Sequence, residues 1–153
     1  MYESIFCKDR RCKKTALRWI FFALLLIADR AVKLLATFYL PETTAQENAR
    51  FFSLSLQNNQ GISFSLLSGF PLVSLVMSIL GIAILGFLYL KNAWLRTSVG
   101  IMFLWAGAMG NMTDRLLYGY VIDWFYVGVY INLADIWLCV GCLIILRRAA
   151  AIF

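Results

Sequence analysis

The chain alternates between long apolar runs and short polar segments. The apolar runs cover residues 19–39, 71–90, 97–115 and 128–147 and carry few charges. A hydrocarbon core of about 30 Å is crossed by roughly 20 apolar residues in a helix. The pattern therefore predicts a single membrane domain, 1–153, of the all-α class, in which four transmembrane helices form a bundle.

Basic residues lie at the ends of these runs. Of the fourteen Lys and Arg residues, ten lie before the first run, between the second and third runs, or at the end of the last one. Basic residues gather in the cytoplasmic segments of membrane proteins, so both termini are predicted to be cytoplasmic. The sequence is 62% hydrophobic and 14% charged, whereas a soluble domain is about a quarter charged. Membrane topology therefore accounts for the net charge of +6 without nucleic-acid binding.

The polar segments on the opposite side predict a small folded region. Residues 51–57 alternate between apolar and polar side chains, which is typical of a short strand or an interfacial segment. The following residues 58–61, Asn-Asn-Gln-Gly, favour a turn. Residues 116–127 are predicted to be an outer loop, because they are rich in the aromatic residues that gather at membrane interfaces. We expect a small β and loop segment on the outer, periplasmic face.

Four aspartates interrupt the apolar sequence. Counting along the helices places Asp29, Asp114, Asp123 and Asp135 all toward the outer leaflet. A carboxylate at membrane depth is costly, and such groups usually face the interior of a bundle or a water-filled cavity. Four of them at one level predict a functional site there.

Two of these aspartates have basic neighbours in the sequence. Asp29 and Lys33 are four residues apart, so they share a helical face and are predicted to form a structural ion pair. Asp114 precedes Arg115 at the end of a predicted helix, which favours a structural salt bridge at this position.

The remaining two aspartates are the best candidates for chemistry. The chain has no histidine, which excludes a Ser-His-Asp triad, a Cys-His dyad and a histidine-ligated zinc site. Two neighbouring carboxylates cannot both ionise easily, so they share a proton and act together as acid and base. Asp123 and Asp135 would converge if the outer loop folds back, and Asp114 is the rival partner.

Five short blocks, spread from the first apolar run to the last, match a known pattern. They are Asp29-Arg30-Ala31-Val32-Lys33, Asn59-Gln60-Gly61-Ile62-Ser63-Phe64, Gly110-Asn111-Met112-Thr113-Asp114-Arg115, Gly119-Tyr120-Val121-Ile122-Asp123 and Asn132-Leu133-Ala134-Asp135. In this order, the blocks resemble those of the signal peptidase II family, the bacterial membrane aspartic peptidases that process lipoproteins. The chain departs from the family at Ser63, Ala106 and Ile136 and has a shorter gap between its last two aspartates.

The resemblance implies a function and a set of site residues. It implies a membrane-embedded aspartic endopeptidase of the bacterial inner membrane that removes signal peptides from prolipoproteins at the periplasmic face. Cleavage precedes a diacylglyceryl-modified cysteine and needs no metal or cofactor. Asp123 and Asp135 match the catalytic aspartates. The positions that shape the site and hold substrate match Asp29, Lys33, Asn59, Gly61, Asn111, Asp114, Arg115 and Asn132. The implied partners are the lipid-modified substrate and membrane lipids, with the enzyme acting as a monomer.

Two other classes of protein can use the same residues. A small transporter or proton-relay subunit would pass protons along the aspartates, and it predicts carboxylates spread through the depth of the membrane. A non-catalytic assembly protein would merely pair its aspartates with Arg30, Lys33 and Arg115. In that case, reversing both charges of a pair would restore function.

Overall fold

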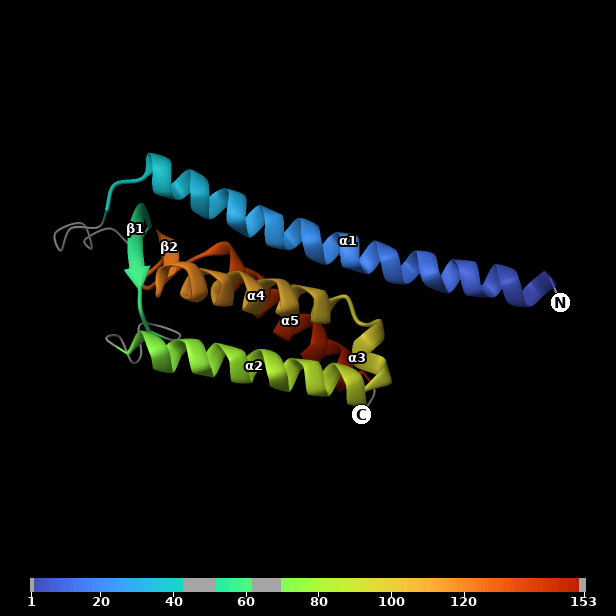
Figure 1. Ribbon diagram of the computed structural model, residues 1–153. Helices are drawn as coiled ribbons and strands as arrows, with labels where there is room; N and C mark the ends of the chain where they lie inside the picture. Colours follow the sequence, from blue (N-terminus) through green and yellow to red (C-terminus); the bar gives the residue numbers. More distant parts are fainter. Residues whose placement is uncertain (1, 43–51, 62–69, 152–153) are drawn as a thin grey trace.

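The computed structural model describes residues 2–42, 52–61 and 70–151, with side chains from residue 13 onward. The elements in chain order are α1 (Tyr2–Tyr39), β1 (Ser53–Asn59), α2 (Pro71–Lys91), α3 (Ala93–Thr97), α4 (Gly100–Tyr118), β2 (Val121–Tyr126), β3 (Tyr130–Ile131) and α5 (Leu133–Ala150). Helices α1 and α2 lie on either side of α4, with α5 behind it, and the strands lie together at one end (Figure 1). The fold is mainly helical with a small sheet, as the apolar pattern predicts.

The last helix begins later than expected. The apolar run from residue 128 predicts a helix there, but α5 starts at Leu133, after the strand β3. Gly128 has a φ of 86°, which reverses the chain between β2 and β3. Asn132 then caps α5: its side chain accepts a hydrogen bond from the backbone N–H of Asp135. Asp135 therefore lies in the first turn of α5 rather than inside a helix that begins at residue 128.

The predicted outer loop over residues 116–127 is also wrong. Helix α4 continues to Tyr118 and ends at Gly119, whose φ of 78° suits glycine at a helix C-terminus. The next residues form β2 instead of a loop. The strand predicted in 51–57 is confirmed as β1, although it extends to Asn59 and so includes two residues of the predicted turn.

The three strands form an antiparallel sheet in the order β1-β2-β3. Asp123 lies opposite Gln57 of β1, and Phe125 lies opposite Ile131 of β3. The β2–β3 hairpin returns the chain toward the start of α5, so Asp123 and the first turn of α5 belong to one compact corner of the molecule.

Small residues allow α4 to approach its neighbours closely, as the glycine- and alanine-rich end of its run predicts. A Cβ atom on Gly107 would contact the carbonyl oxygen of Ala134 and lie 2.7 Å from Cγ of Leu138, both in α5. A Cβ atom on Gly110 would lie 2.7 Å from Oδ2 of Asp29 in α1. These two glycines bring α1, α4 and α5 together beside the aspartates.

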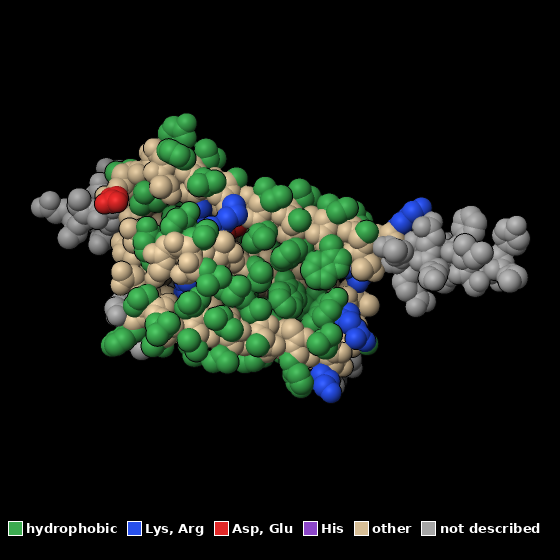
Figure 2. Space-filling model, in the orientation of Figure 1, with side chains coloured by type: hydrophobic (Ala, Val, Ile, Leu, Met, Phe, Trp, Pro, Cys, Tyr) green, Lys and Arg blue, Asp and Glu red, His purple; other side chains and the backbone are tan. Residues whose placement is uncertain are grey.

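The outer surface of the helices is apolar. Large hydrophobic side chains are exposed along α1, α2, α4 and α5, and they cover most of the face shown in Figure 2. Among the described residues, one helix, Pro71–Lys91, is by itself long and apolar enough to cross a membrane. Contiguous exposed apolar surface of this extent is typical of a protein surrounded by lipid.

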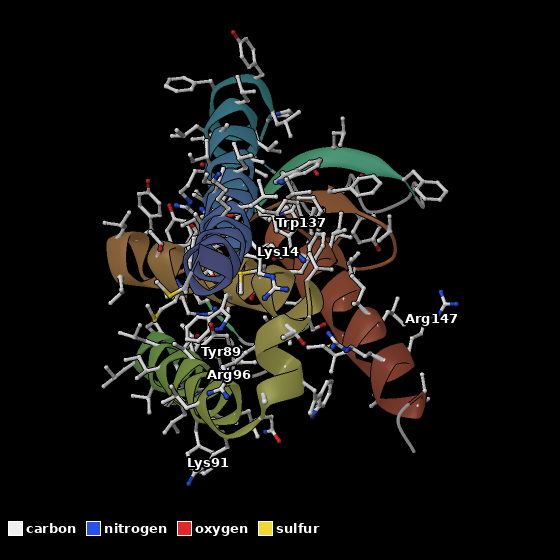
Figure 3. The ribbon with its side chains drawn as sticks, turned by 90° about the vertical axis from the view of Figure 1, so that its right-hand side faces the viewer. Lys14, Tyr89, Lys91, Arg96, Trp137 and Arg147 are labelled. Carbon is white, nitrogen blue, oxygen red and sulfur yellow. The ribbon has the colours of Figure 1, made fainter. Side chains whose placement is uncertain are left out.

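Basic residues gather at the end opposite the sheet. Lys91, Arg96 and Arg147 lie at this end, which faces the viewer in Figure 3. Arg18 donates hydrogen bonds to the carbonyl oxygen of Arg96 at 2.9 Å, and Arg148 donates to Oγ1 of Thr97 at 2.8 Å. The basic residues that separate the apolar runs in sequence are therefore neighbours in space.

Candidate active site

Asp123 lies on β2 and is held by two amide groups. Its Oδ1 accepts a hydrogen bond from Nδ2 of Asn132 at 2.6 Å, and its Oδ2 accepts one from Nδ2 of Asn59 at 3.0 Å. The residue is 1% exposed. Burial is the main cause that raises the pKa of Asp123 from 3.8 to about 7, and the negative charge of Asp135 raises it further. The two amide hydrogen bonds oppose this rise.

Asp135 lies in the first turn of α5, where free backbone N–H groups favour a carboxylate. Its Oδ2 accepts from the backbone N–H of Asn132 at 3.1 Å, and its Oδ1 accepts from Nδ2 of Asn111 at 2.8 Å. Asn132 thus hydrogen-bonds to Asp135 with its backbone and to Asp123 with its side chain. One asparagine joins the two carboxylates.

The other two aspartates belong to a cluster of charged side chains between α1 and α4. Nζ of Lys33 lies 3.0 Å from Oδ2 of Asp29 and 2.7 Å from Oδ2 of Asp114. Arg30 also pairs with Asp114, and its Nη2 lies 3.6 Å from Oδ2 of Asp29. Asp29, Lys33 and Asp114 are buried, and Oδ1 of Asp29 accepts from the backbone N–H of Ala134 at 2.9 Å. The predicted Asp29–Lys33 ion pair is therefore present.

Asp114 has different partners from the predicted one. Its salt bridges are made with Arg30 and Lys33 of α1 rather than with the adjacent Arg115. Neighbouring residues on a helix point in different directions. Arg115 instead donates to the carbonyl oxygen of Gly61 at 3.0 Å and to that of Asn111 at 3.4 Å.

Gly61 joins the end of β1 to this network. Its backbone N–H donates to Oδ1 of Asn59 at 2.9 Å, and its carbonyl oxygen accepts from Arg115. These contacts bring all ten candidate residues into one region, in which Asp123 and Asp135 share Asn132 and the remaining aspartates share Lys33. Arg30 is not among the site residues predicted from the sequence. Its position between Asp29 and Lys33, in one of the five matching blocks, could have indicated it.

The arrangement differs from what a proton relay predicts. The four aspartates form one connected network at the sheet end of the helices and are not spread along them. Among the described residues, no three His, Cys, Asp or Glu side chains are grouped so as to hold a metal ion. The carboxylates of Asp29 and Asp114 already have cationic partners.

An apolar helical body that holds two carboxylates around one asparagine defines a membrane protein with a paired-carboxylate site. Comparison with protein families narrows this class to one family. Residues 21–150 match the family model described as signal peptidase (SPase) II, and the chain belongs to this family of peptidases.

Curated relatives carry the name lipoprotein signal peptidase. The protein from Sinorhizobium fredii is 33% identical, covering 80% of this chain and 79% of the relative. The one from Francisella tularensis subsp. novicida is 33% identical, over 90% and 92% of the two chains. That from Vibrio cholerae is 31% identical, over 88% and 87%.

Solved structures share the fold. One is a bacterial membrane enzyme determined by the in meso method at 2.3 Å resolution, with a TM-score of 0.72 and 24% identity over 89% of this chain and 88% of that one. A second, at 1.9 Å resolution, has a TM-score of 0.70 and 23% identity over 88% and 92%. The fold is thus that of a membrane enzyme.

Proposed function

We propose that the protein is an aspartic endopeptidase that removes the signal peptide from diacylglyceryl-modified prolipoproteins, cleaving before the lipidated cysteine. The observation that carries this proposal is the pair of carboxylates, the buried Asp123 and the half-buried Asp135, joined by Asn132. Among the described residues, their hydrogen-bond partners are neutral amides, and no cation forms a salt bridge with either carboxylate. Such a pair retains one proton, which is what acid–base cleavage of a peptide bond requires.

The proposed reaction uses one protonated and one ionised carboxyl group. The ionised group takes a proton from a water molecule, and the resulting hydroxide forms a bond to the carbon of the scissile carbonyl. The protonated group donates its proton to the carbonyl oxygen. The tetrahedral intermediate then collapses: one of its hydroxyl protons returns to the carboxylate that had donated it, the C–N bond breaks, and the leaving amine takes up the proton that came from water. The carboxylate pair supplies both the acid and the base, so the proposed reaction uses no metal or cofactor.

The pKa of Asp123 supports this division of roles. A value of about 7 keeps a proton in the pair near neutral pH. Because the two groups interact, they titrate together, and a pH profile reports apparent values for the pair.

The exposed apolar side chains support a position within the bilayer. In this proposal α1, α2, α4 and α5 span the inner membrane as a monomeric bundle. The basic end and both termini are cytoplasmic, and the sheet and carboxylates lie at the periplasmic side. A diacylated substrate would reach the site from the lipid, and Asn59, Asn111, Asn132 and Arg115 would supply polar contacts to its peptide. Cross-linking of a lipopeptide to these four positions would support this; labelling confined to the turn around Lys91 would contradict it.

The test is the processing of a lipidated prolipoprotein by membranes that carry wild type, Asp123→Asn, Asp135→Asn or Asp114→Asn at matched protein levels. Asparagine nearly preserves the shape of aspartate but cannot act as acid or base. We expect wild type to cleave and both dyad variants to lose at least about 10³-fold in rate. If both retain cleavage while Asp114→Asn is inactive, the pair is assigned wrongly. A wild type that cleaves nothing would refute the proposed function.

A further inference from the structure

Three asparagine side chains hold the carboxylate pair, and each is oriented by a hydrogen-bond donor. Oδ1 of Asn59 accepts from the backbone N–H of Gly61, and Oδ1 of Asn132 accepts from the backbone N–H of Asp135. Both asparagines therefore turn their NH₂ groups to Asp123. The third, Asn111, is oriented by a side chain instead of the backbone.

That side chain is Lys33, which is 1% exposed. Its ammonium group forms ion pairs with Asp29 at 3.0 Å and Asp114 at 2.7 Å, and it donates a hydrogen bond to Oδ1 of Asn111 at 3.1 Å. An ammonium group donates hydrogen bonds and cannot accept one. Asn111 must therefore turn its carbonyl oxygen to Lys33, which leaves its NH₂ group pointing at Oδ1 of Asp135.

We propose that Lys33 is a positioning residue that, through Asn111, keeps Asp135 the ionised member of the pair and leaves the shared proton on Asp123. This inference rests on the proposed function. It assigns each carboxyl group a role: Asp135 accepts the proton from water, and Asp123 donates its proton to the carbonyl oxygen of the substrate.

The physical reason is the group that a rotated Asn111 amide would present to Asp135. If the Asn111 amide turned by 180°, its carbonyl oxygen would face Asp135, and only a protonated carboxyl group could donate a hydrogen bond to it. The present orientation donates to Asp135 and so favours the ionised form. Lys33 prevents the rotation, because the turned amide would bring its NH₂ group against the ammonium.

The other charged groups around the pair do not replace Lys33. They are Asp29 and Arg30 from α1 and Asp114 and Arg115 from α4. Among the described contacts, Arg30 bonds to Asp114, Asp29 and the carbonyl oxygen of Gly110. Arg115 bonds to backbone carbonyl oxygens. Lys33 is the cation that contacts the Asn111 side chain.

The experiment compares Lys33→Met, Lys33→Arg and the matched control Arg30→Met. Arg30 belongs to the same charged cluster but does not orient Asn111. For each purified full-length protein, kcat and KM for a lipidated prolipoprotein are measured across pH. In Lys33→Met, we expect kcat to fall about tenfold or more and KM to change less than about twofold. The acidic limb of the plot of kcat against pH should move up by about one pH unit.

The other two variants distinguish an effect on the orientation of the Asn111 amide from an effect on the stability of the protein. Lys33→Arg restores a cationic donor and returns the acidic limb to the wild-type position. Arg30→Met lowers the thermal stability of the protein but leaves the acidic limb where it is. The inference is overturned if the limb in Lys33→Met does not move, or if it moves equally in Arg30→Met.

A second variant covers the case in which Lys33→Met does not fold. Asp29→Asn with Lys33→Met removes one negative and one positive charge together and leaves the Arg30–Asp114 pair in place. Compared with Asp29→Asn alone, the acidic limb should move up in this double variant, and equal profiles would overturn the inference.

Wild type and Asp135→Asn are measured alongside to distinguish the two proposals. If wild type cleaves, Asp135→Asn does not, and the limb stays fixed in the Lys33 variants, then only the role of Lys33 is wrong. Absence of cleavage by wild type overturns both.

Discussion

The molecule contains two groups of carboxylates at the same end, and their surroundings differ. Asp29 and Asp114 are neutralised by Lys33 and Arg30. The other two aspartates are held mainly by the amides of asparagines. One end of the molecule therefore holds carboxylates in two different electrostatic environments.

The difference shows how one fold separates a structural from a chemical use of aspartate. A carboxylate paired with cations stays ionised, and removing one partner leaves a buried charge uncompensated. A carboxylate held by neutral amides next to a like charge retains a proton near neutral pH. We therefore expect the cluster between α1 and α4 to govern stability and the pair at Asn132 to govern turnover.

The sharpest test of this comparison sets Asp114→Asn against Asp123→Asn. Asp114→Asn removes a shared partner of Lys33 and Arg30, so the free energy of unfolding should fall by about 3–5 kcal/mol. Activity per folded molecule should fall less than about tenfold, whereas Asp123→Asn should lose at least about 10³-fold. Thermal unfolding and cleavage rates of the same preparations check both. Equal effects of the two variants on both quantities would contradict the division between the groups.

The second test is the pH dependence of stability. The pKa of Asp123 is raised from 3.8 to about 7 in the folded protein, so the folded state holds a proton that the unfolded chain releases. The stability linked to this proton is present at low pH and is lost as the pH rises from 3.8 to about 7. The loss is on the order of 4 kcal/mol.

The control for this test is Asp123→Asn, which cannot titrate. The measurement runs from about pH 5 to about pH 8, a range that brackets the titration. Over this range, the melting temperature of the variant in detergent should fall less steeply than that of wild type. Parallel curves for the two proteins would show that Asp123 does not hold the proton.

A smaller effect should follow from removing Asn132, the residue that joins the two catalytic candidates. Asn132→Ala removes both the amide that contacts Asp123 and the cap of α5. We expect the rate of cleavage to fall about 10²-fold and the free energy of unfolding to fall by about 1 kcal/mol. Rate and unfolding measurements at one pH check this, and a loss of stability with an unchanged rate would argue against a shared site.

The smallest effect concerns packing beside the charged cluster. In Gly110→Ala the new methyl group would lie 2.7 Å from Oδ2 of Asp29, and we expect a loss of about 1–3 kcal/mol in stability. Gly81→Ala is the matched control, because nothing lies within 4 Å of its Cβ position; it should be neutral or stabilise by about 0.5–1 kcal/mol. Chemical or thermal unfolding compares the two variants, and similar behaviour would show that α1 and α4 have room to adjust.

The apolar runs predicted helices well but not all of their ends. Pro71–Lys91 matches its run closely, because hydrophobic length and the flanking proline and lysine are local signals. The start of α5 was missed because the sequence over residues 128–131, Gly-Val-Tyr-Ile, fits either a strand or a helix. The pairing of Tyr126 with Tyr130 and the positive φ of Gly128 decide in favour of the hairpin.

The sequence by itself determined the helical, membrane-facing character of the chain, the family, and the four aspartates at one level. It did so because hydrophobic period, charge position and short blocks are properties of neighbouring residues. Only the tertiary structure decided which cation meets which carboxylate. Lys33 reaches Asp114 and Asn111 across 81 and 78 residues of sequence, and such contacts depend on how α1 packs against α4. That packing gives Asp114 its partners in α1 and leaves Asp123 and Asp135 with amides.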